Sequence, residues 1–251
     1  MQTDQPTTPD VQVFDDPELV AREAAGLFVR LSVKAVAVRG AFSVALSGGS
    51  TPRRVYELLA SDDYCTQVNW PSVHVFFGDE RTVPPEHPDS NYRMANEALL
   101  SRVRLPAENI HRMEGVGDAA ANASRYESGL RAFFGEVSWP RFDLVMLGMG
   151  DDGHTASLFP GSAALEEQTA WVVANWVEKF QTWRITLTAP AINAARRVLF
   201  LVTGASKAER LREVLKGERD PTRLPSQLIR PGDGALEWFV DRAAAARLEG
   251  V

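Results

Sequence analysis

The chain has very little cysteine and no long apolar run. Cys65 is the only cysteine among the 251 residues, so no disulfide can form within the chain and a cysteine metal cluster is excluded. Such a composition is typical of a reducing compartment, and we expect a cytoplasmic protein. No apolar run approaches the roughly 20 residues of a membrane-spanning helix, so no membrane partner is expected. The N-terminal segment also lacks the charged-then-apolar pattern of a signal peptide.

Positive charge is in short supply as well. The 27 Lys and Arg residues are outnumbered by 33 Asp and Glu residues, which leaves a net charge of −6. Nucleic-acid binders normally carry a basic excess or stripe, so we expect no nucleic-acid partner. The histidines at positions 74, 87, 111 and 154 show no zinc-ligand spacing, so we expect no protein-bound metal. An acidic chain can still bind a small phosphate through local basic side chains and backbone N–H groups.

What the chain does contain is a regular alternation of apolar strands and amphipathic helices. Apolar runs predict strands at 42–46, 73–77, 142–147, 171–174, 183–187, 198–202 and 236–240. Helical spacing and capping residues predict helices at 16–40, from 51 onward, and at 90–103, 118–134, 206–215 and 241–248. This alternation predicts a Rossmann-like α/β fold, with a mainly parallel sheet covered by helices on both faces. We expect one α/β domain over 11–251, preceded by a flexible lead at 1–10.

Four of the predicted strands end at loops with glycine, hydroxyl or charged residues. In a parallel sheet of this kind, ligands bind beyond the carboxyl ends of the strands. We therefore expect the loops that follow Leu46, Phe77, Leu147 and Val202 to form one pocket.

The first of these loops, SGGSTP at 47–52, places glycines and hydroxyls at a strand-to-helix junction. Glycines let the backbone approach a ligand closely, and free N–H groups at a helix N-terminus favour an anion. The loop predicts phosphate binding by Ser47, Gly48, Gly49, Ser50 and Thr51, with an ordinary Ser/Thr helix cap as the competing interpretation. A P-loop lysine is missing, and Pro52 replaces the last glycine of a nucleophile elbow, so a serine hydrolase is disfavoured.

The third loop carries a histidine. Its GMGDDG segment at 148–153 has the spacing of a dinucleotide-binding loop, but Asp151 and Asp152 would put two negative charges where a pyrophosphate should lie. His154 follows directly, and an imidazole can exchange protons near neutral pH. Asp151 or Asp152 could orient or polarise it. A histidine that merely caps the next turn is the competing interpretation.

The second and fourth loops carry charged residues. In GDER, at 78–81, Asp79 could orient a sugar hydroxyl or a water, and Arg81 could bind a phosphate or a developing oxyanion. A self-neutralising surface turn would explain the same residues. Lys207 lies near the start of a predicted helix at the same edge of the sheet, where it could neutralise a phosphate, although most lysines are simply solvated.

Together, the four loops resemble those of the 6-phosphogluconolactonases. The matching segments, in the family's order and spacing, are SGGSTP (47–52), GDERTVPPEHPDSNY (78–92), LGMGDDGHTASLFPG (147–161) and TGASK (203–207). The resemblance implies a glucosamine-6-phosphate deaminase-like fold and hydrolysis of 6-phospho-D-glucono-1,5-lactone to 6-phospho-D-gluconate, without cofactor or metal. His154 would be the general base, with Asp152, Asp151 and Asp79 as further catalytic candidates. The 47–51 loop, Arg81 and Lys207 would bind the 6-phosphate, or Arg81 would lie by the carbonyl oxygen.

Two alternatives remain beside this hypothesis. Glucosamine-6-phosphate deaminases share the glycine loop and the Asp-Gly-His element, but their next segment typically reads more like Ile-Ala-Phe-Asn-Glu-Pro than the TASLFP found at 155–160. The other alternative is a non-catalytic sugar-phosphate sensor on the same fold. His154 and the GDER segment argue against it, because binding alone needs no base. We expect a monomer or a weak homo-oligomer.

Overall fold

The computed structural model describes residues 9–248. Its centre is a six-stranded sheet with the strand order β1-β9-β8-β5-β2-β3. Every strand pair in this sheet is parallel. The strands are β1 (Asp10–Phe14), β2 (Phe42–Leu46), β3 (Val73–Phe77), β5 (Leu144–Gly148), β8 (Arg197–Val202) and β9 (Ala235–Asp241).

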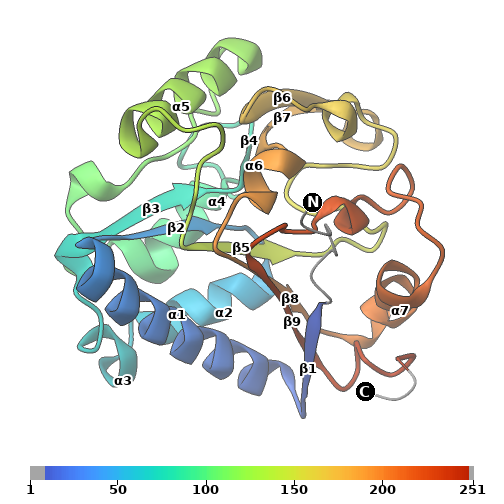
Figure 1. Cartoon of the computed structure of the whole chain (residues 1–251), viewed down its shortest axis with the longest axis horizontal. Helices are drawn as coiled ribbons and strands as arrows, with labels where there is room; N and C mark the ends of the chain where they lie inside the picture. The colour runs from blue at the N-terminus through green and yellow to red at the C-terminus, as the bar shows by residue number, and fades with distance from the viewer. Residues whose placement is uncertain (1–8, 249–251) are drawn as a thin grey trace, which may run out of the picture.

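Helices cover both faces of this sheet, as the sequence predicts. Figure 1 shows α1 (Pro17–Arg39) and α2 (Ser50–Leu59) on one side, and α5 (Ala119–Phe134) and α6 (Ala189–Asn193) on the other. The remaining helices are α3 (Asp62–Cys65), α4 (Asn91–Ala95) and α7 (Ala208–Lys216). The predicted ends of α1 are confirmed, because the Asp16 side chain accepts a hydrogen bond from Leu19 N and Gly40 adopts a left-handed conformation.

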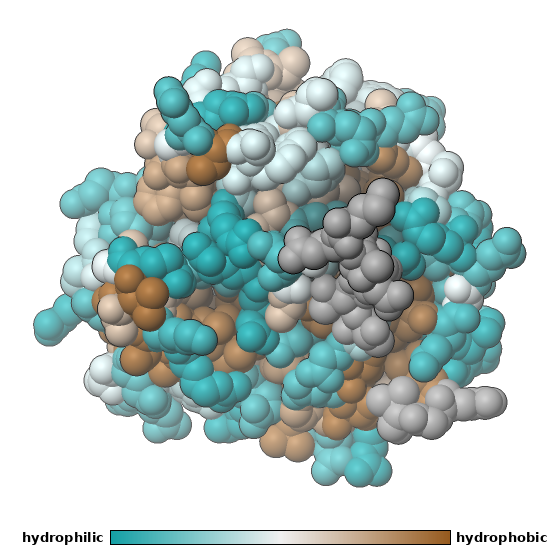
Figure 2. All heavy atoms as spheres, viewed as in Figure 1, coloured by the Kyte–Doolittle hydropathy of each residue, from teal (hydrophilic) through white to brown (hydrophobic). Residues whose placement is uncertain are grey.

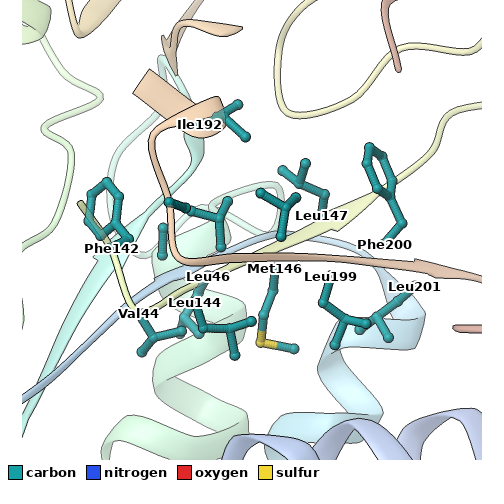
Figure 3. Packing of buried hydrophobic residues seen from close by; sticks show 14 of the residues in the cluster. Val44, Leu46, Phe142, Leu144, Met146, Leu147, Ile192, Leu199, Phe200 and Leu201 are labelled. Carbon is teal, nitrogen blue, oxygen red and sulfur yellow. The ribbon is translucent and has the colours of Figure 1, made fainter. Parts of the chain in front are cut away.

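The core lies between the central strands and these helices. Side chains of β5 and β8 alternate between the two faces of the sheet (Figure 3). Met146 and Leu199 point toward the α1 and α2 side, whereas Leu147 and Phe200 point toward Ile192 of α6, and all five are fully buried. Outside the core, hydrophilic residues cover much of the face shown in Figure 2, and hydrophobic residues gather there in separate patches.

A second, smaller sheet lies beside the first. It contains β4 (Asp79–Arg81), β6 (Val172–Val177) and β7 (Thr182–Leu187) in the order β4-β7-β6, and its strand pairs are antiparallel. The sequence predicts β6 and β7 but neither their separate sheet nor β4. The latter has only three residues, all charged, and therefore gives no apolar signal.

Three further expectations about the chain need comment. The expected lead at 1–10 falls largely on residues 1–8, outside the described part, while Asp10 already belongs to β1, a strand that we did not predict. The helix predicted at 90–103 is confirmed at its Ser90 cap but ends a little earlier, because α4 continues as a π-helix over Asn96–Leu100 and stops there. The helix predicted at 241–248 is wrong, because the Asp241 side chain binds Gly204 N and Ala244 N and only turns follow.

Candidate active site

The loops after β2, β3, β5 and β8 meet at one edge of the six-stranded sheet, as predicted. The strands β2 and β5 are neighbours, and the chain continues from β2 to β3 on one side and from β5 to β8 on the other. Such a switch point is the usual ligand site of an open α/β sheet. A cleft of about 250 Å³ lies there, lined by 47–52, Asp79, Arg81, Asn91, 148–150, His154, Ala156, 201–203 and Lys207. Nine of the eleven residues predicted for the site line this cleft, and Asp151 and Asp152 do not.

The 47–52 loop presents an uncapped helix N-terminus to the cleft. Gly49, with a φ of 110°, is the N-cap of α2, and no side chain of residues 9–248 caps this helix. The competing interpretation of a Ser/Thr cap is therefore wrong, and the first N–H groups of α2 can bind an anion. At Gly48, a Cβ atom would lie 2.0 Å from Asn91 Oδ1, so a side chain there would displace Asn91. The buried Ser47 Oγ has no hydrogen-bond partner within the described residues.

Lys207 reaches the same end of the cleft from the β8 side. Its Nζ lies 2.6 Å from Asp151 Oδ1, and Asp151 is the more exposed partner. Next to this pair, Thr51 Oγ1 and Thr203 Oγ1 lie 2.8 Å apart. A cation, hydroxyls and a helix N-terminus thus surround one space, and this is an arrangement that suits a phosphate group.

The His154 imidazole is paired with Asp152 rather than Asp151. Its Nδ1 lies 2.5 Å from Asp152 Oδ1, and Lys179 Nζ lies 3.1 Å from Asp152 Oδ2. Burial opposes ionisation of Asp152, but the hydrogen bonds from His154 and Lys179 outweigh it and hold the pKa of Asp152 well below its usual value. An ionised Asp152 accepts a hydrogen bond from Nδ1–H, which leaves Nε2 of neutral His154 as the basic nitrogen. The geometry is that of an oriented general base.

Glycines and backbone hydrogen bonds hold this histidine loop in place. A Cβ atom on Gly150 would lie 2.1 Å from His154 Nδ1, so a side chain there would displace the ring. Gly153 has a φ of 84°, and its carbonyl oxygen accepts hydrogen bonds from both N and Oγ of Ser226. The ring of His154 stacks on Phe159 with centroids 4.1 Å apart. The competing interpretation of His154 as a simple cap leaves this side-chain pairing unexplained.

Asp79 and Glu80 are buried, so the interpretation of GDER as a surface turn is wrong. Asp79 accepts hydrogen bonds from Ser157 Oγ at 2.6 Å and from Asn91 Nδ2 at 3.1 Å. The Glu80 carboxylate binds Ser90 Oγ and the backbone N–H groups of Asn91 and Tyr92, while burial raises its pKa. These contacts fix the start of α4 and place Asn91 in the cleft.

Arg81 lines the cleft beside Asp79. Its Nη1 donates a hydrogen bond to the carbonyl oxygen of Asp89, whereas its Nε is buried without a partner in the described structure. A buried N–H group without an acceptor is rare in native proteins. The missing acceptor suits either a phosphate or a carbonyl oxygen of a ligand, the two roles that the sequence predicts.

Within residues 9–248, no helix is long and apolar enough to cross a membrane. Over the same residues, no group of three or more His, Cys, Asp or Glu side chains is arranged to hold a metal ion.

Comparison with known proteins shows the family to which the chain belongs. A sequence model of the family described as glucosamine-6-phosphate isomerases/6-phosphogluconolactonase matches residues 15–238. The chain belongs to this family. A 6-phosphogluconolactonase from Nostoc sp. is 43% identical over 237 residues, which cover 93% of this chain and 95% of the relative. Another from Synechocystis sp. is 42% identical over 243 residues, covering 96% and 98%. The solved structure of a 6-phosphogluconolactonase from Trypanosoma cruzi superposes with a TM-score of 0.87 at 30% identity, covering 98% of each chain.

Membership of the glucosamine-6-phosphate isomerase/6-phosphogluconolactonase family confirms the resemblance seen in the four loop segments. Those segments already contain two site residues that we did not predict, Asn91 and Ser157. Nothing in a single sequence distinguishes them from other polar loop residues. A third, Lys179, lies outside the segments and reaches Asp152 only because β6 and β7 bring it there.

Proposed function

We propose that this protein hydrolyses 6-phospho-D-glucono-1,5-lactone to 6-phospho-D-gluconate, the oxidative pentose phosphate reaction that the named relatives indicate. The observation that carries the proposal is that His154, paired with Asp152, lines the same cleft as the uncapped N-terminus of α2. A base and an anion site in one cleft suit an ester that carries a phosphate. A sensor would need only the anion site, and the similarity to enzymes named lactonases favours hydrolysis over deamination.

His154 acts as the general base in this proposal. Its Nε2 takes a proton from a water as the water oxygen attacks C1 of the lactone, and the carbonyl oxygen becomes negatively charged. The bond between C1 and the ring oxygen then breaks, and the imidazolium returns its proton to that oxygen. Asp152 stabilises the imidazolium between the two steps. Such proton transfer contributes about 10²–10⁴-fold to the rate. A lactone is an activated ester, so no covalent intermediate is needed.

The phosphate of the substrate binds at the 47–51 loop and Lys207. The α2 N–H groups and the Lys207 ammonium supply donors on one side of the cleft, and Thr51 and Thr203 supply hydroxyls. Binding at this non-reacting group fixes the distance from the phosphate to C1 and so orients C1 for attack. The phosphate would compete with the exposed Asp151 for Lys207.

Asp79 serves this site by positioning other residues. Both of its carboxylate oxygens already accept hydrogen bonds, from Ser157 and from Asn91. It therefore holds Asn91, whose side chain lines the cleft, against the Gly48 backbone. Substrate hydroxyls would meet Asn91 and the remaining lone pairs of Asp79.

The experiment that tests this function uses the lactone directly. The lactone is generated in situ by oxidation of glucose 6-phosphate, and its loss is followed against spontaneous hydrolysis. The proposal predicts faster loss in proportion to the protein added, and no ammonia from glucosamine 6-phosphate. Loss at the spontaneous rate by a protein that still binds 6-phospho-D-gluconate would favour the sensor. Release of ammonia would favour the deaminase.

We also propose a cytoplasmic location and a monomeric or weakly associating state. The location rests on the single cysteine, as argued above. Sedimentation velocity at micromolar and higher concentrations tests the state, and a concentration-independent oligomer would contradict it.

A further inference from the structure

Arg184 lies beside Arg81 on the side of the small sheet that borders the cleft. Between β4 and β7, Asp79 is opposite Thr186 and Arg81 is opposite Arg184. Directly opposite residues of an antiparallel pair share a face of the sheet, and so do alternate residues along a strand. All four side chains therefore lie on one face, the face from which Asp79 and Arg81 reach the cleft. Arg184 lies on that face one strand farther on, next to the cleft-lining Arg81 although not itself among the lining residues.

The Arg184 guanidinium has no acidic partner in the described structure. No carboxylate of residues 9–248 forms an ion pair with it, and its Nε is buried without an acceptor. Burial, and next the charge of Arg81, lower the pKa of Arg184, whereas the charges of Asp79, Asp89 and Glu80 raise it without outweighing these two effects. The Nε of Arg81 is likewise buried without an acceptor among the described residues.

This arrangement raises the free energy of the protein when no ligand is bound. A buried N–H group without an acceptor loses its hydrogen bond to water and gains none, and two neighbouring guanidinium groups repel each other. An oxyanion between the two groups would remove both costs at once. Planar guanidinium groups match the paired oxygens of phosphate and carboxylate, which is why arginine is the usual residue for binding them.

A row of aromatic rings runs from Arg184 to the base. Its Cζ lies 5.7 Å from the centroid of the Phe180 ring. The ring of Phe180 meets that of Phe159 edge-on at 5.7 Å, and Phe159 stacks on His154 at 4.1 Å. Two ring contacts therefore connect Arg184 to the imidazole.

We propose that Arg184 and Arg81 form a two-guanidinium site for an oxyanion of the substrate, and that Arg184 is a substrate-binding residue of the cleft. This inference rests on the proposed function for the identity of the substrate. The oxyanion is either the 6-phosphate or the oxygen that becomes negatively charged at C1 and ends as the product carboxylate. Both have the chemistry that a guanidinium pair recognises.

The test compares Arg184→Gln with Arg184→Lys and with a matched control, Arg141→Gln. Arg141 is an exposed arginine just before β5 of the six-stranded sheet, at the edge opposite the cleft, where it pairs with Asp233. We expect Arg184→Gln to weaken substrate binding or turnover about 10- to 100-fold, the effect of losing one hydrogen bond between charged groups. Arg184→Lys keeps the charge but loses the planar guanidinium group. Its substrate binding or turnover should lie between those of the wild type and Arg184→Gln. The Arg141 variant should match the wild type.

A structural role for Arg184 predicts a different signature. If the guanidinium only held the fold together, Arg184→Gln would lower the melting temperature of the unliganded protein and leave the KM unchanged. Our proposal predicts the reverse, with an unliganded melting temperature at or above that of the wild type. The stabilisation by saturating 6-phospho-D-gluconate should then be smaller in the variant. Because Arg184→Lys keeps the charge in place, it provides the same comparison if the glutamine variant fails to fold.

Calorimetric titration with three probes locates the oxyanion. A loss of affinity for inorganic phosphate and for 6-phospho-D-gluconate places the pair on the 6-phosphate. A loss for D-gluconate and 6-phospho-D-gluconate, or a lower kcat at unchanged KM, places it on C1. Unchanged binding of all three probes and unchanged kinetics in Arg184→Gln would overturn the inference. Failure of the proposed function would be seen separately, as a wild-type protein that does not accelerate loss of the lactone.

Discussion

Replacing Asp152 with asparagine tests how the imidazole is oriented. The substitution keeps the size of the side chain but removes the charge that His154 Nδ1 and Lys179 Nζ meet at 2.5 and 3.1 Å. An amide can also turn its NH₂ group toward Nδ1, which would move the ring proton to Nε2 and abolish the base. Asp152 is three-quarters buried, so solvent screens these contacts only in part.

The size of the effect follows from the hydrogen bond that is lost. A hydrogen bond to a charged group contributes about 1.5–3 kcal/mol, and the Asp152 bond strengthens when His154 becomes an imidazolium in the transition state. At about 1.4 kcal/mol for each factor of ten, Asp152→Asn should lower kcat about 10- to 150-fold. The KM should change little, since Asp152 does not line the cleft.

The assay is steady-state lactone hydrolysis, corrected for the spontaneous reaction. Asp151→Asn is the matched control, because the neighbouring carboxylate is exposed and pairs with Lys207 instead of the imidazole. Its kcat should stay near the wild-type value. Equal kcat values for the two variants, or a wild-type kcat for Asp152→Asn, would refute the argument that Asp152 orients His154.

Three other outcomes are expected. Gly150→Ala should lower kcat strongly and the free energy of unfolding, measured with urea, only slightly. Its Cβ would lie 2.1 Å from His154 Nδ1 and would displace the imidazole. Lys207→Ala should raise the KM about tenfold or more and leave kcat nearly unchanged, since a charged phosphate contact is lost. Burial, and next the charge of His74, lower the pKa of His111 to about 4. As the pH is lowered, this histidine therefore binds a proton near pH 6.5 in the unfolded chain but only near pH 4 in the folded protein. The free energy of unfolding should fall as the pH drops from about 6.5 to 4. His111→Phe should flatten that slope in urea titrations, and an unchanged slope would contradict the assignment.

The convergence of the four loops was predictable because parallel strands end at the same edge. Once strands were assigned at 42–46, 73–77, 142–147 and 198–202, their loops had to meet, whatever the exact bounds of the elements. The glycines in those loops added a second signal, since Gly48 and Gly150 each face a side chain that a Cβ would strike. The cleft and most of its lining therefore followed from local patterns.

Contacts that depend on tertiary pairing could not be predicted in this way. Asp151 and Asp152 are adjacent in sequence, yet one pairs with Lys207 and the other with His154, and only the path of the loop decides which. The short strand β4 has no hydrophobic pattern, so its pairing with β7 gave no signal. Because the β4–β7 pairing could not be predicted, neither could the position of Arg184 beside Arg81.

The most direct measurement of the central claim is the lactone turnover of His154→Asn beside its affinity for 6-phospho-D-gluconate. Because His154 supplies the base while the α2 N-terminus and Lys207 hold the phosphate, the variant should bind the product nearly as tightly as the wild type. Its kcat should fall by about 10²–10⁴-fold. A variant that kept near-wild-type turnover would show that the water is activated by another group, and the account of this cleft would be wrong.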